Sequence, residues 1–202
     1  MLEECHGKSQ NKTHDFEFKT SSSNRMNLFG KTLRDKTELG WYMAAIVDVL
    51  DHFPHDHSKR SEIITIFKKT INALLKVQDP ETGLWYQVLD QGNRAGNYLE
   101  TSASSMFTYA IFKGCRKGYL DSSVKKAGEK AFSSLVKHEI YENDKGGFTL
   151  KNTCRVAGLG NIPYRDGSFE YYISEPKKEN DIKGVGAFIQ AAAELEGGDK
   201  LP

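Results

Sequence analysis

The sequence has little of what would mark several classes of protein. Three cysteines stand far apart among 202 residues, and this odd number without metal-ligand spacing indicates neither a disulfide framework nor a zinc site. Charge is nearly balanced, with 28 Lys and Arg against 27 Asp and Glu, so the basic surface of a nucleic-acid binder is not expected. No apolar run approaches the roughly 20 residues that cross a bilayer. Neither a nucleic acid nor a membrane is therefore expected as partner.

The first residues also lack the apolar segment of a signal peptide, which favours the cytoplasm. Residues 1–36 are polar and without sustained periodicity, so we expect a disordered or unrelated segment there. Asn11 begins a glycosylation sequon that matters only on a secretory route. What remains has enough apolar material for a packed core, because 38% of the chain is hydrophobic and 11% aromatic. We expect one domain over 37–196 and a tail at 197–202.

From Trp41 onward, apolar residues recur at helical spacing in successive pairs of segments. Ser58 is a candidate cap for the second helix and Thr101 or Ser102 for the third, while Ser122 opens the fourth. After each of the first two pairs, a glycine precedes a short β-prone run, at 84–88 and 146–150. The predicted helices cover 41–53, 58–75, 99–117, 122–136 and 181–195.

This unit of two helices, a glycine and a short strand repeats at roughly 60 residues, and such hairpins bury their apolar faces by stacking. A toroid of helical hairpins is favoured over an open superhelix, because the connection at 152–179 is long and rich in glycine and aromatics. Connections above about 15 residues in compact domains are usually functional or disordered, and the aromatics favour a site. A ring of six hairpins needs about 350 residues at this period, so we expect the C-terminal part of a ring.

Two tryptophans are candidates for binding a sugar. Trp41 follows Gly40 at a helix start, where its indole would stack on a flat apolar sugar face, although a core position explains it as well. Trp85 lies in the run GLWYQVLD at 83–90, which fits either carbohydrate binding or packing at the rim.

Three further residues are candidates for polar contacts. Glu100 precedes an apolar helix, where it either faces the substrate or interacts with the helix dipole. Tyr164 and Arg165 stand in a turn followed by an alternating, strand-like run at 164–172. Arg165 suits a substrate carboxylate, but it would pair equally with Asp166 or Glu170. We expect the histidines at 52, 55 and 57 to be exposed to solvent rather than to bind a metal.

Several long motifs together resemble glycoside hydrolase family 105, the unsaturated rhamnogalacturonyl hydrolases, which are allied to the unsaturated glucuronyl hydrolases of family 88. The resemblance covers about 39–196 and is specific because the motifs occur in the right order. It rests on GWYMA at 40–44 with VDVL at 47–50, GLWYQVLD at 83–90, GNYLETSASSMFTYA at 96–110 with KGCRKGYL at 113–120, and CRVAGLG at 154–160 with YRDGSFEYYISEP at 164–176.

The resemblance implies an all-α fold, an (α/α)6 barrel that is incomplete here and has short β strands in its connecting loops. It implies an oligosaccharide substrate whose terminal uronic acid carries the C4=C5 double bond left by pectin lyases. An aspartic acid of the family protonates the double bond, water adds at C5, and the hemiketal opens to release the sugar. No metal or organic cofactor is implied.

The sequence departs from the family where the acid is expected. The upstream motif that carries the catalytic aspartate, and the segment with a substrate-contacting histidine, are both missing. Asp35 and Thr37 occupy positions where the family usually has Trp and Arg. Trp41 alone carries over as a matching binding residue. We therefore expect this chain to be inactive alone; a non-catalytic carbohydrate-binding remnant, or a helical interaction scaffold, is the alternative.

Overall fold

The computed structural model describes residues 36–197, so the predicted N-terminal segment, Asn11 and most of the expected tail lie outside the described residues. Five longer helices make up most of it, as the sequence predicted: α2 (Lys36–His52), α3 (Arg60–Lys76), α4 (Thr101–Arg116), α5 (Lys125–Ser134) and α7 (Ile182–Glu196). The shorter helical segments are η1 (Leu89–Gln91), η2 (Ser122–Val124), the π-helical η3 (Leu135–Glu139) and α6 (Phe169–Ser174).

Two small antiparallel ladders complete the fold. Strand β1 (Ile140–Glu142) pairs with β2 (Phe148–Leu150), which lies within the predicted β-prone run at 146–150. Strand β3 (Thr153–Cys154) pairs with β4 (Lys177–Lys178) and brings together the two ends of the long connection. The other β-prone run, 84–88, is extended but has a single β-bridge, between Tyr86 and Leu99.

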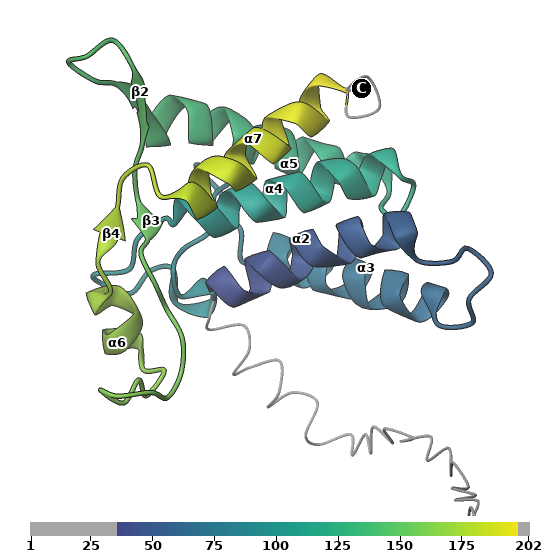
Figure 1. Ribbon diagram of the computed structural model, residues 1–202, viewed down its shortest axis with the longest axis horizontal. Helices are drawn as coiled ribbons and strands as arrows, with labels where there is room; N and C mark the ends of the chain where they lie inside the picture. Colours follow the sequence, from purple (N-terminus) through teal and green to yellow (C-terminus); the bar gives the residue numbers. More distant parts are fainter. Residues whose placement is uncertain (1–35, 198–202) are drawn as a thin grey trace, which may run out of the picture.

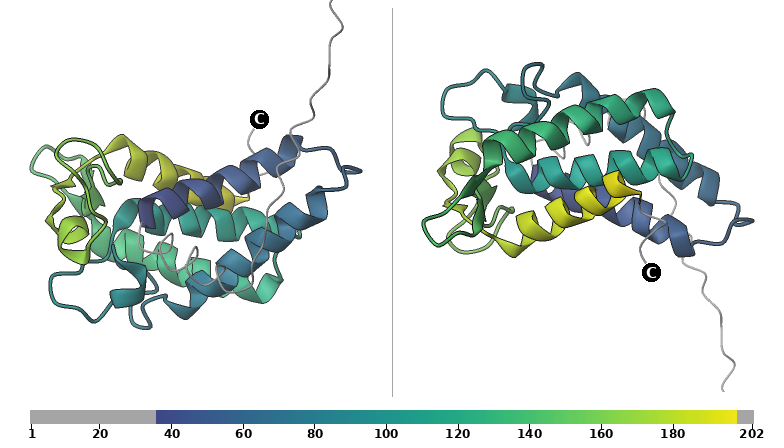
Figure 2. Two further views of the ribbon diagram at one scale, coloured as in Figure 1. Left: turned by 90° about the horizontal axis from the view of Figure 1, so that it is seen from below. Right: turned by 90° about the horizontal axis from the view of Figure 1, so that it is seen from above.

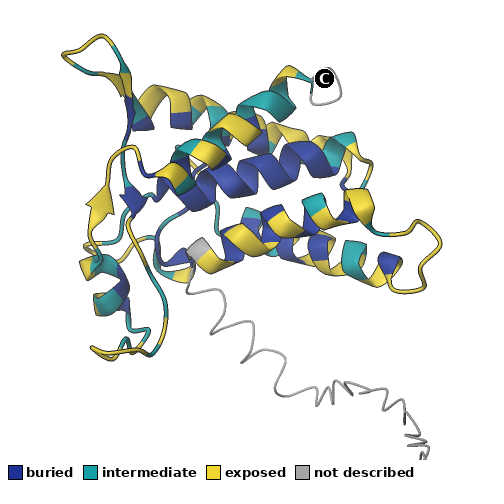
Figure 3. Cartoon of the chain, in the orientation of Figure 1, coloured by how far each residue is buried: buried dark blue, intermediate teal, exposed yellow. Residues whose placement is uncertain are grey.

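Helix α4 lies at the centre of the molecule. It packs against α2 and α7 on one side and against α5 on the other, while α3 pairs with α2 (Figures 1 and 2). The fourteen consecutive residues Thr101–Gly114 of α4 are buried, which Figure 3 shows as an unbroken dark-blue helix. A helix that is buried on all sides is a core helix, and its polar groups need partners within the protein.

The sequence of α4 meets that need locally. Ser105 Oγ donates to the Thr101 carbonyl at 2.8 Å, and Thr108 Oγ1 donates to the Ser104 carbonyl at 2.8 Å. Gly40 allows α2 to come close, because a Cβ at that position would lie 2.8 Å from Met106 Sδ. The glycine of the Gly-Trp motif therefore has a packing role between α2 and α4.

The structure corrects three local predictions. Helix α3 begins at Arg60 after Lys59, without a side-chain cap from Ser58. Helix α4 is capped by Glu100 rather than by Thr101 or Ser102. The strand-like run at 164–172 contains the helix α6, because Ser168 Oγ accepts a hydrogen bond from Tyr171 N, and Phe169 and Tyr172 bury one helical face.

Candidate functional site

One end of the molecule gathers the connections that were expected to build a site. The N-termini of α2, α4 and α7 point to the end where β1 to β4 and α6 lie (Figure 1). The base of the long connection is closed there by the β3–β4 ladder and by a hydrogen bond of 2.8 Å from Arg155 N to the Pro176 carbonyl. This end, called the loop end below, is the candidate functional site.

Glu100 is the centre of the hydrogen bonds at the loop end, and its side chain is completely buried. Its Oε1 accepts from Ser102 N at 3.1 Å, from Ser102 Oγ at 2.6 Å and from Cys154 N at 3.0 Å. Its Oε2 accepts from Ala103 N at 2.8 Å. A buried carboxylate is costly unless it is hydrogen-bonded, and here backbone and hydroxyl donors supply those bonds. The arrangement agrees with the capping alternative for Glu100 and leaves its carboxylate no exposed surface for a sugar.

Trp85 lies in the core of this end rather than on its surface. It is completely buried, and its Nε1 donates to the Leu74 carbonyl at 2.9 Å. Its ring packs edge-on to Phe107 with centroids 5.3 Å apart. Glu100 N donates to the Trp85 carbonyl at 3.0 Å, so these two predicted residues are neighbours. Burial favours the packing alternative for Trp85, because no face of the indole is open to a ligand.

Trp41 lies on the second turn of α2 and reaches the loop end from a different element. Its exposed fraction is 52%. Tyr42 and Val49 on the same helix are about half exposed as well. An indole so exposed is not a core residue and has a face available for a sugar ring; sugar binding by Trp41 stays a prediction.

Tyr164 and Arg165 close a turn within the long connection. Gly160 N donates to the Arg165 carbonyl at 2.9 Å, and Arg165 N donates to the Gly160 carbonyl at 3.0 Å. The Tyr164 side chain is 80% exposed, and Arg165 is partly buried. Both side chains therefore belong to an ordered surface turn that projects from the loop end.

The partners expected for Arg165 within the protein are engaged elsewhere. Glu170 forms an ion pair with Arg94, whose guanidinium lies 3.9 Å from the centroid of the Phe169 ring. Asp166 accepts a hydrogen bond of 2.8 Å from Ser168 N, which lowers the pKa of that carboxyl. In the structure, Glu170 therefore forms its ion pair with Arg94 and not with Arg165.

The sequence reasoning missed a second buried carboxylate at the loop end, Glu139. Its Oε2 accepts from Asn152 Nδ2 at 2.9 Å and from Thr101 Oγ1 at 3.3 Å. Burial raises the pKa of Glu139, and the hydrogen bonds from Asn152 and Thr101 offset part of that rise. No signal in the sequence marks this residue, since it ends a helix in an ordinary run of polar residues.

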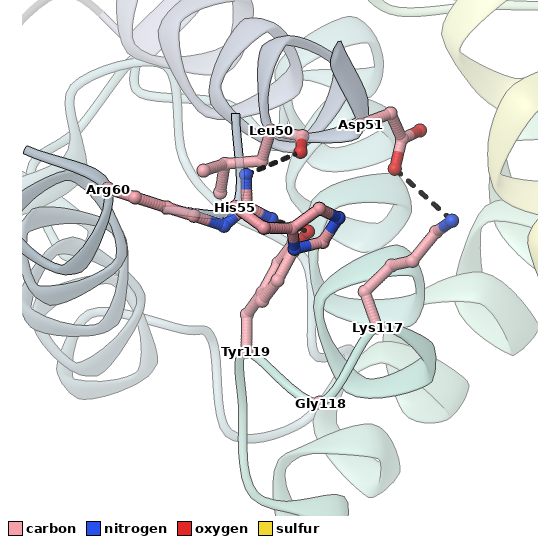
Figure 4. A pocket seen from close by; sticks show the side chains of 7 residues that line it. All are labelled: Leu50, Asp51, His55, Arg60, Lys117, Gly118 and Tyr119. Carbon is pink, nitrogen blue, oxygen red and sulfur yellow. Dashed lines mark hydrogen bonds and ion pairs between the residues drawn. The ribbon is translucent and has the colours of Figure 1, made fainter. Parts of the chain in front are cut away.

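A cavity of about 400 Å³ lies at the opposite end of the helices, around Asp51 and Arg60 (Figure 4). Arg60 Nη1 donates to the Leu50 carbonyl at 2.9 Å and to the Phe53 carbonyl at 2.6 Å, and Nη2 donates to Tyr119 Oη at 3.0 Å. Asp51 pairs with Lys117 at 3.2 Å. Because these charged groups already bind one another or the backbone, they hold the ends of α2, α3 and α4 together.

The three histidines lie at that same far end and are exposed, as predicted. Within residues 36–197, no group of three His, Cys, Asp or Glu side chains is placed to hold a metal ion. Of the described helices, none has the length and apolar character to span a membrane. Cys115 and Cys154 form no disulfide within the described residues.

Known proteins resemble most of the described chain. Residues 38–197 match the family model described as Glycosyl Hydrolase Family 88. Protein Atu3128 of Agrobacterium fabrum is 38% identical over 162 residues, which make up 77% of this chain and 69% of that protein. The 24.9 kDa protein in the picA locus of Rhizobium radiobacter matches with the same figures.

Solved structures agree with the predicted fold. A family 105 glycoside hydrolase of C. acetobutylicum is 48% identical with a TM-score of 0.76, over 78% of this chain and 44% of that one. A possible family 105 member from Salmonella enterica is 28% identical with a TM-score of 0.64, over 77% of this chain and 38% of that one. The unsaturated glucuronyl hydrolase of Bacillus sp. GL1 is 16% identical with a TM-score of 0.58, over 81% of this chain and 39% of that one, and shows the fold alone.

The chain thus spans less than half of each of these solved chains. The prediction of an incomplete six-hairpin helical barrel, with short strands in its connections, is confirmed.

Proposed function

The chain belongs to glycosyl hydrolase family 88, and from that membership we propose that it is part of an enzyme that releases a 4,5-unsaturated uronic acid from pectin-derived oligosaccharides. The observation that carries the proposal is the family match over residues 38–197. The 48% identity to a family 105 glycoside hydrolase supports the same class of enzyme.

The proposed reaction is a hydration of the C4=C5 double bond. An aspartic acid gives its proton to C4, and water adds its hydroxyl at C5 while the water's second proton returns to a carboxylate. The resulting hemiketal opens by cleavage of the C5–O5 bond, which leaves a ketone at C5 and a hemiacetal at C1. The hemiacetal then collapses to an aldehyde, and the glycosidic oxygen leaves as a hydroxyl group on the rest of the oligosaccharide. The aspartic acid must both give and take a proton, which calls for a tuned pKa.

Within this chain, we assign substrate binding rather than proton transfer to the loop end. Trp41 would stack on the sugar ring, because its indole is half exposed near the N-terminus of α2. Arg165 would pair with the uronic carboxylate through its planar guanidinium. Tyr164, adjacent and 80% exposed, would contact the same sugar. Trp85 and Glu100, which are completely buried, would support this surface from within the protein without touching the sugar.

The first experiment tests whether the chain turns over substrate by itself. Purified protein is mixed with an unsaturated rhamnogalacturonan disaccharide, and loss of the absorbance of the C4=C5 double bond is followed. We expect no loss above a buffer blank, because the sequence lacks the aspartate motif of the family. Turnover at a rate typical of enzymes would contradict the proposal that this chain is inactive alone.

The second experiment tests the role of the matched part. In the family 105 enzyme of C. acetobutylicum, the segment that matches this chain is replaced by residues 38–197. We expect this chimera to hydrolyse the disaccharide, because the replaced segment would then supply the binding surface. In the chimera, Trp41→Ala should raise KM at least tenfold, whereas Val49→Ala, which trims another half-exposed apolar side chain of α2 two turns further from the loop end, should change KM little. A folded but inactive chimera would contradict the proposed function.

The alternative is a carbohydrate-binding remnant without catalysis, favoured by the exposed aromatic side chains of Trp41 and Tyr164. It predicts that the isolated chain binds the disaccharide in calorimetry and that Trp41→Ala abolishes the heat. The enzyme proposal requires the chimera to be active, so the two experiments separate the alternatives.

A further inference from the structure

The carboxylate of Glu100 joins two parts of the chain that lie 54 residues apart. Three of its hydrogen bonds come from the first turn of α4, from the Ser102 backbone, the Ser102 hydroxyl and the Ala103 backbone. The fourth comes from Cys154 N in β3, at 3.0 Å. The first three bonds are those of a helix cap. The fourth, from Cys154 N, does not contribute to capping α4.

The bond to Cys154 acts on both ends of the long connection. Cys154 is paired with Lys177 in the β3–β4 ladder, so the strand that leads into the connection is joined to the strand that leads out of it. The neighbouring bond from Thr101 N to the Asn152 carbonyl, at 3.1 Å, holds the same base against α4. The segment 152–179 is therefore attached to the buried helix at its base. Further along, α6 packs against Val88, and the turn with Tyr164 is exposed.

We propose that Glu100 is a positioning residue that fixes the segment 152–179 to the N-terminus of α4. Its side-chain length is what allows the carboxylate to reach both the helix amides and Cys154 N. Aspartate, which is one methylene shorter, is among the best residues for a helix cap. An aspartate at position 100 would keep the cap bonds and lose the bond to β3.

That difference separates the proposal from a capping role alone. If Glu100 served only as a cap, Glu100→Asp would leave the connection unchanged. If Glu100 positions the connection, the same change loosens 152–179 while α4 stays protected. The attachment of 152–179 to α4 does not depend on the proposed function. Its effect on sugar binding does, because Tyr164 and Arg165, which lie in this segment, are the residues proposed to contact the sugar.

The test is amide hydrogen exchange, followed by mass spectrometry on the full chain. We compare the wild-type protein with Glu100→Asp, Glu100→Gln and the control Ser102→Ala, which removes one bond on the α4 side alone. We expect Glu100→Asp to speed exchange in peptides from 152–179 by about tenfold or more, the order expected when a hydrogen bond to a charged acceptor is lost. Peptides from 103–114 should keep wild-type rates, and Ser102→Ala should leave 152–179 unchanged.

Glu100→Gln is the second variant, because it keeps the length and shape of the side chain but has a single acceptor oxygen. It should also speed exchange in 152–179, by less than Glu100→Asp. Wild-type exchange in 152–179 for both variants would overturn the proposal. So would exchange that rises equally in α4 and in the connection, since that result would give Glu100 a general structural role.

Binding supplies an independent arm. In the chimera described above, Glu100→Asp should raise KM for the disaccharide with kcat nearly unchanged. An inactive wild-type chimera with the expected exchange pattern would contradict the proposed function and leave the positioning role standing. An active chimera together with unchanged exchange in Glu100→Asp would support the proposed function and contradict the positioning role of Glu100.

Discussion

The two ends of α4 are held in different ways. At its N-terminus, the carboxylate of Glu100 accepts hydrogen bonds from backbone amides, one of them from the distant strand β3. At its C-terminus, Lys113 forms ion pairs with Asp48 at 2.7 Å and with Asp51 at 2.8 Å, both on α2. Arg116 binds Glu194 of α7 through two bonds of 2.7 Å.

Both ends suit the helix dipole, which favours negative charge at the N-terminus and positive charge at the C-terminus. They differ in what they fasten. The C-terminal cations Lys113 and Arg116 join α4 to α2 and α7, so we call that end the scaffold end. The N-terminal carboxylate joins α4 to the base of the connection that carries Tyr164 and Arg165. The following predictions test this division, in decreasing order of expected effect.

The largest effect is expected at the scaffold end, from Lys113→Met. Burial alone lowers the pKa of Lys113, but hydrogen bonds with Asp48, Asp51 and Tyr109 outweigh burial and raise it. Removing the ammonium leaves Asp48 and the Tyr109 hydroxyl without their cation, and breaking a buried pair costs several kcal/mol. Because Asp48 is partly exposed, we expect a loss of about 2–3 kcal/mol in the free energy of unfolding, measured by urea denaturation.

Lys117→Met is the matched control. Lys117 also pairs with Asp51, at 3.2 Å, but its side chain is 34% exposed. We expect a loss of about 0–1 kcal/mol. Equal losses for the two variants would show that burial does not distinguish the two ion pairs, and would weaken the description of this end as a buried scaffold.

The second effect is expected where α7 meets β3 at the loop end, from Gly184→Ala. A Cβ at Gly184 would overlap the hydroxyl of Thr153, which is completely buried. Overpacking a well-packed contact costs about 1–3 kcal/mol. A thermal melt should therefore show a clear decrease in Tm.

Gly186→Ala on the same helix is the control, because a Cβ there meets no atom within 4 Å. Replacing an exposed helical glycine by alanine should raise stability by roughly 0.5–1 kcal/mol. If Gly184→Ala were also stabilising, the close contact between α7 and β3 would not limit packing at the loop end.

The helices could be predicted from the sequence because their apolar periodicity is local. Each of the five predicted ranges overlaps one long helix; α2 begins at Lys36, before the predicted start at Trp41, and the other boundaries differ by a few residues at most. The caps were harder to predict, since Glu100 replaced Thr101 and Ser102 as the cap of α4. Glutamate is a less common cap than serine or threonine, and its bond to Cys154 is a long-range contact that no local rule includes.

The candidate site was predictable in part. Trp41 and Tyr164 are exposed, so that sugar binding at both stays a prediction, whereas Trp85 is a core residue. An aromatic side chain in a loop has the same sequence signal whether it faces a ligand or the interior. Deciding between the two requires the long-range contact of Trp85 with Leu74 and Phe107, which the sequence does not reveal.

A third prediction concerns the pH dependence of stability. The pKa of Glu139 is raised above its ordinary value of 4.5 in the folded chain. The folded state therefore holds this proton to a higher pH than the unfolded state does, and the free energy of unfolding falls as pH rises from the ordinary to the raised value. Glu139→Gln removes the titrating group and keeps an oxygen that can accept from Asn152.

We expect Glu139→Gln to match or exceed the stability of the wild-type protein at pH 7, by up to about 1 kcal/mol, and to decline less between pH 4.5 and 7. Urea denaturation at a series of pH values measures both quantities. Asp121→Asn, at an exposed carboxyl whose pKa is lowered from its ordinary 3.8, is the control; it should leave the slope between pH 4.5 and 7 unchanged, because that group titrates below this range. If Glu139→Gln had the same dependence of unfolding free energy on pH as the wild-type protein, ionisation of Glu139 would not destabilise the fold, and this prediction would be wrong.

The smallest effect is expected from Arg94→Ala, which tests whether side-chain contacts also matter at the loop end. Arg94 pairs with Glu170, but both side chains are about half exposed or more, at 47% and 68%. Its guanidinium also lies over the ring of Phe169, at 3.9 Å from the centroid. Exposed ion pairs and cation–π contacts each contribute about 0.5–1 kcal/mol or less, so the variant should lose about 1 kcal/mol in total.

Two companion variants divide that loss. Glu170→Gln removes the ion pair alone and should cost about 0.5 kcal/mol or less, with a dependence on salt. Arg94→Lys keeps the charge but loses the planar group that stacks on Phe169, and should fall between the wild-type protein and Arg94→Ala. A loss from Arg94→Ala as large as that from Lys113→Met would mean that the loop end, too, is held by charged side chains, and the contrast between the two ends of α4 would no longer hold.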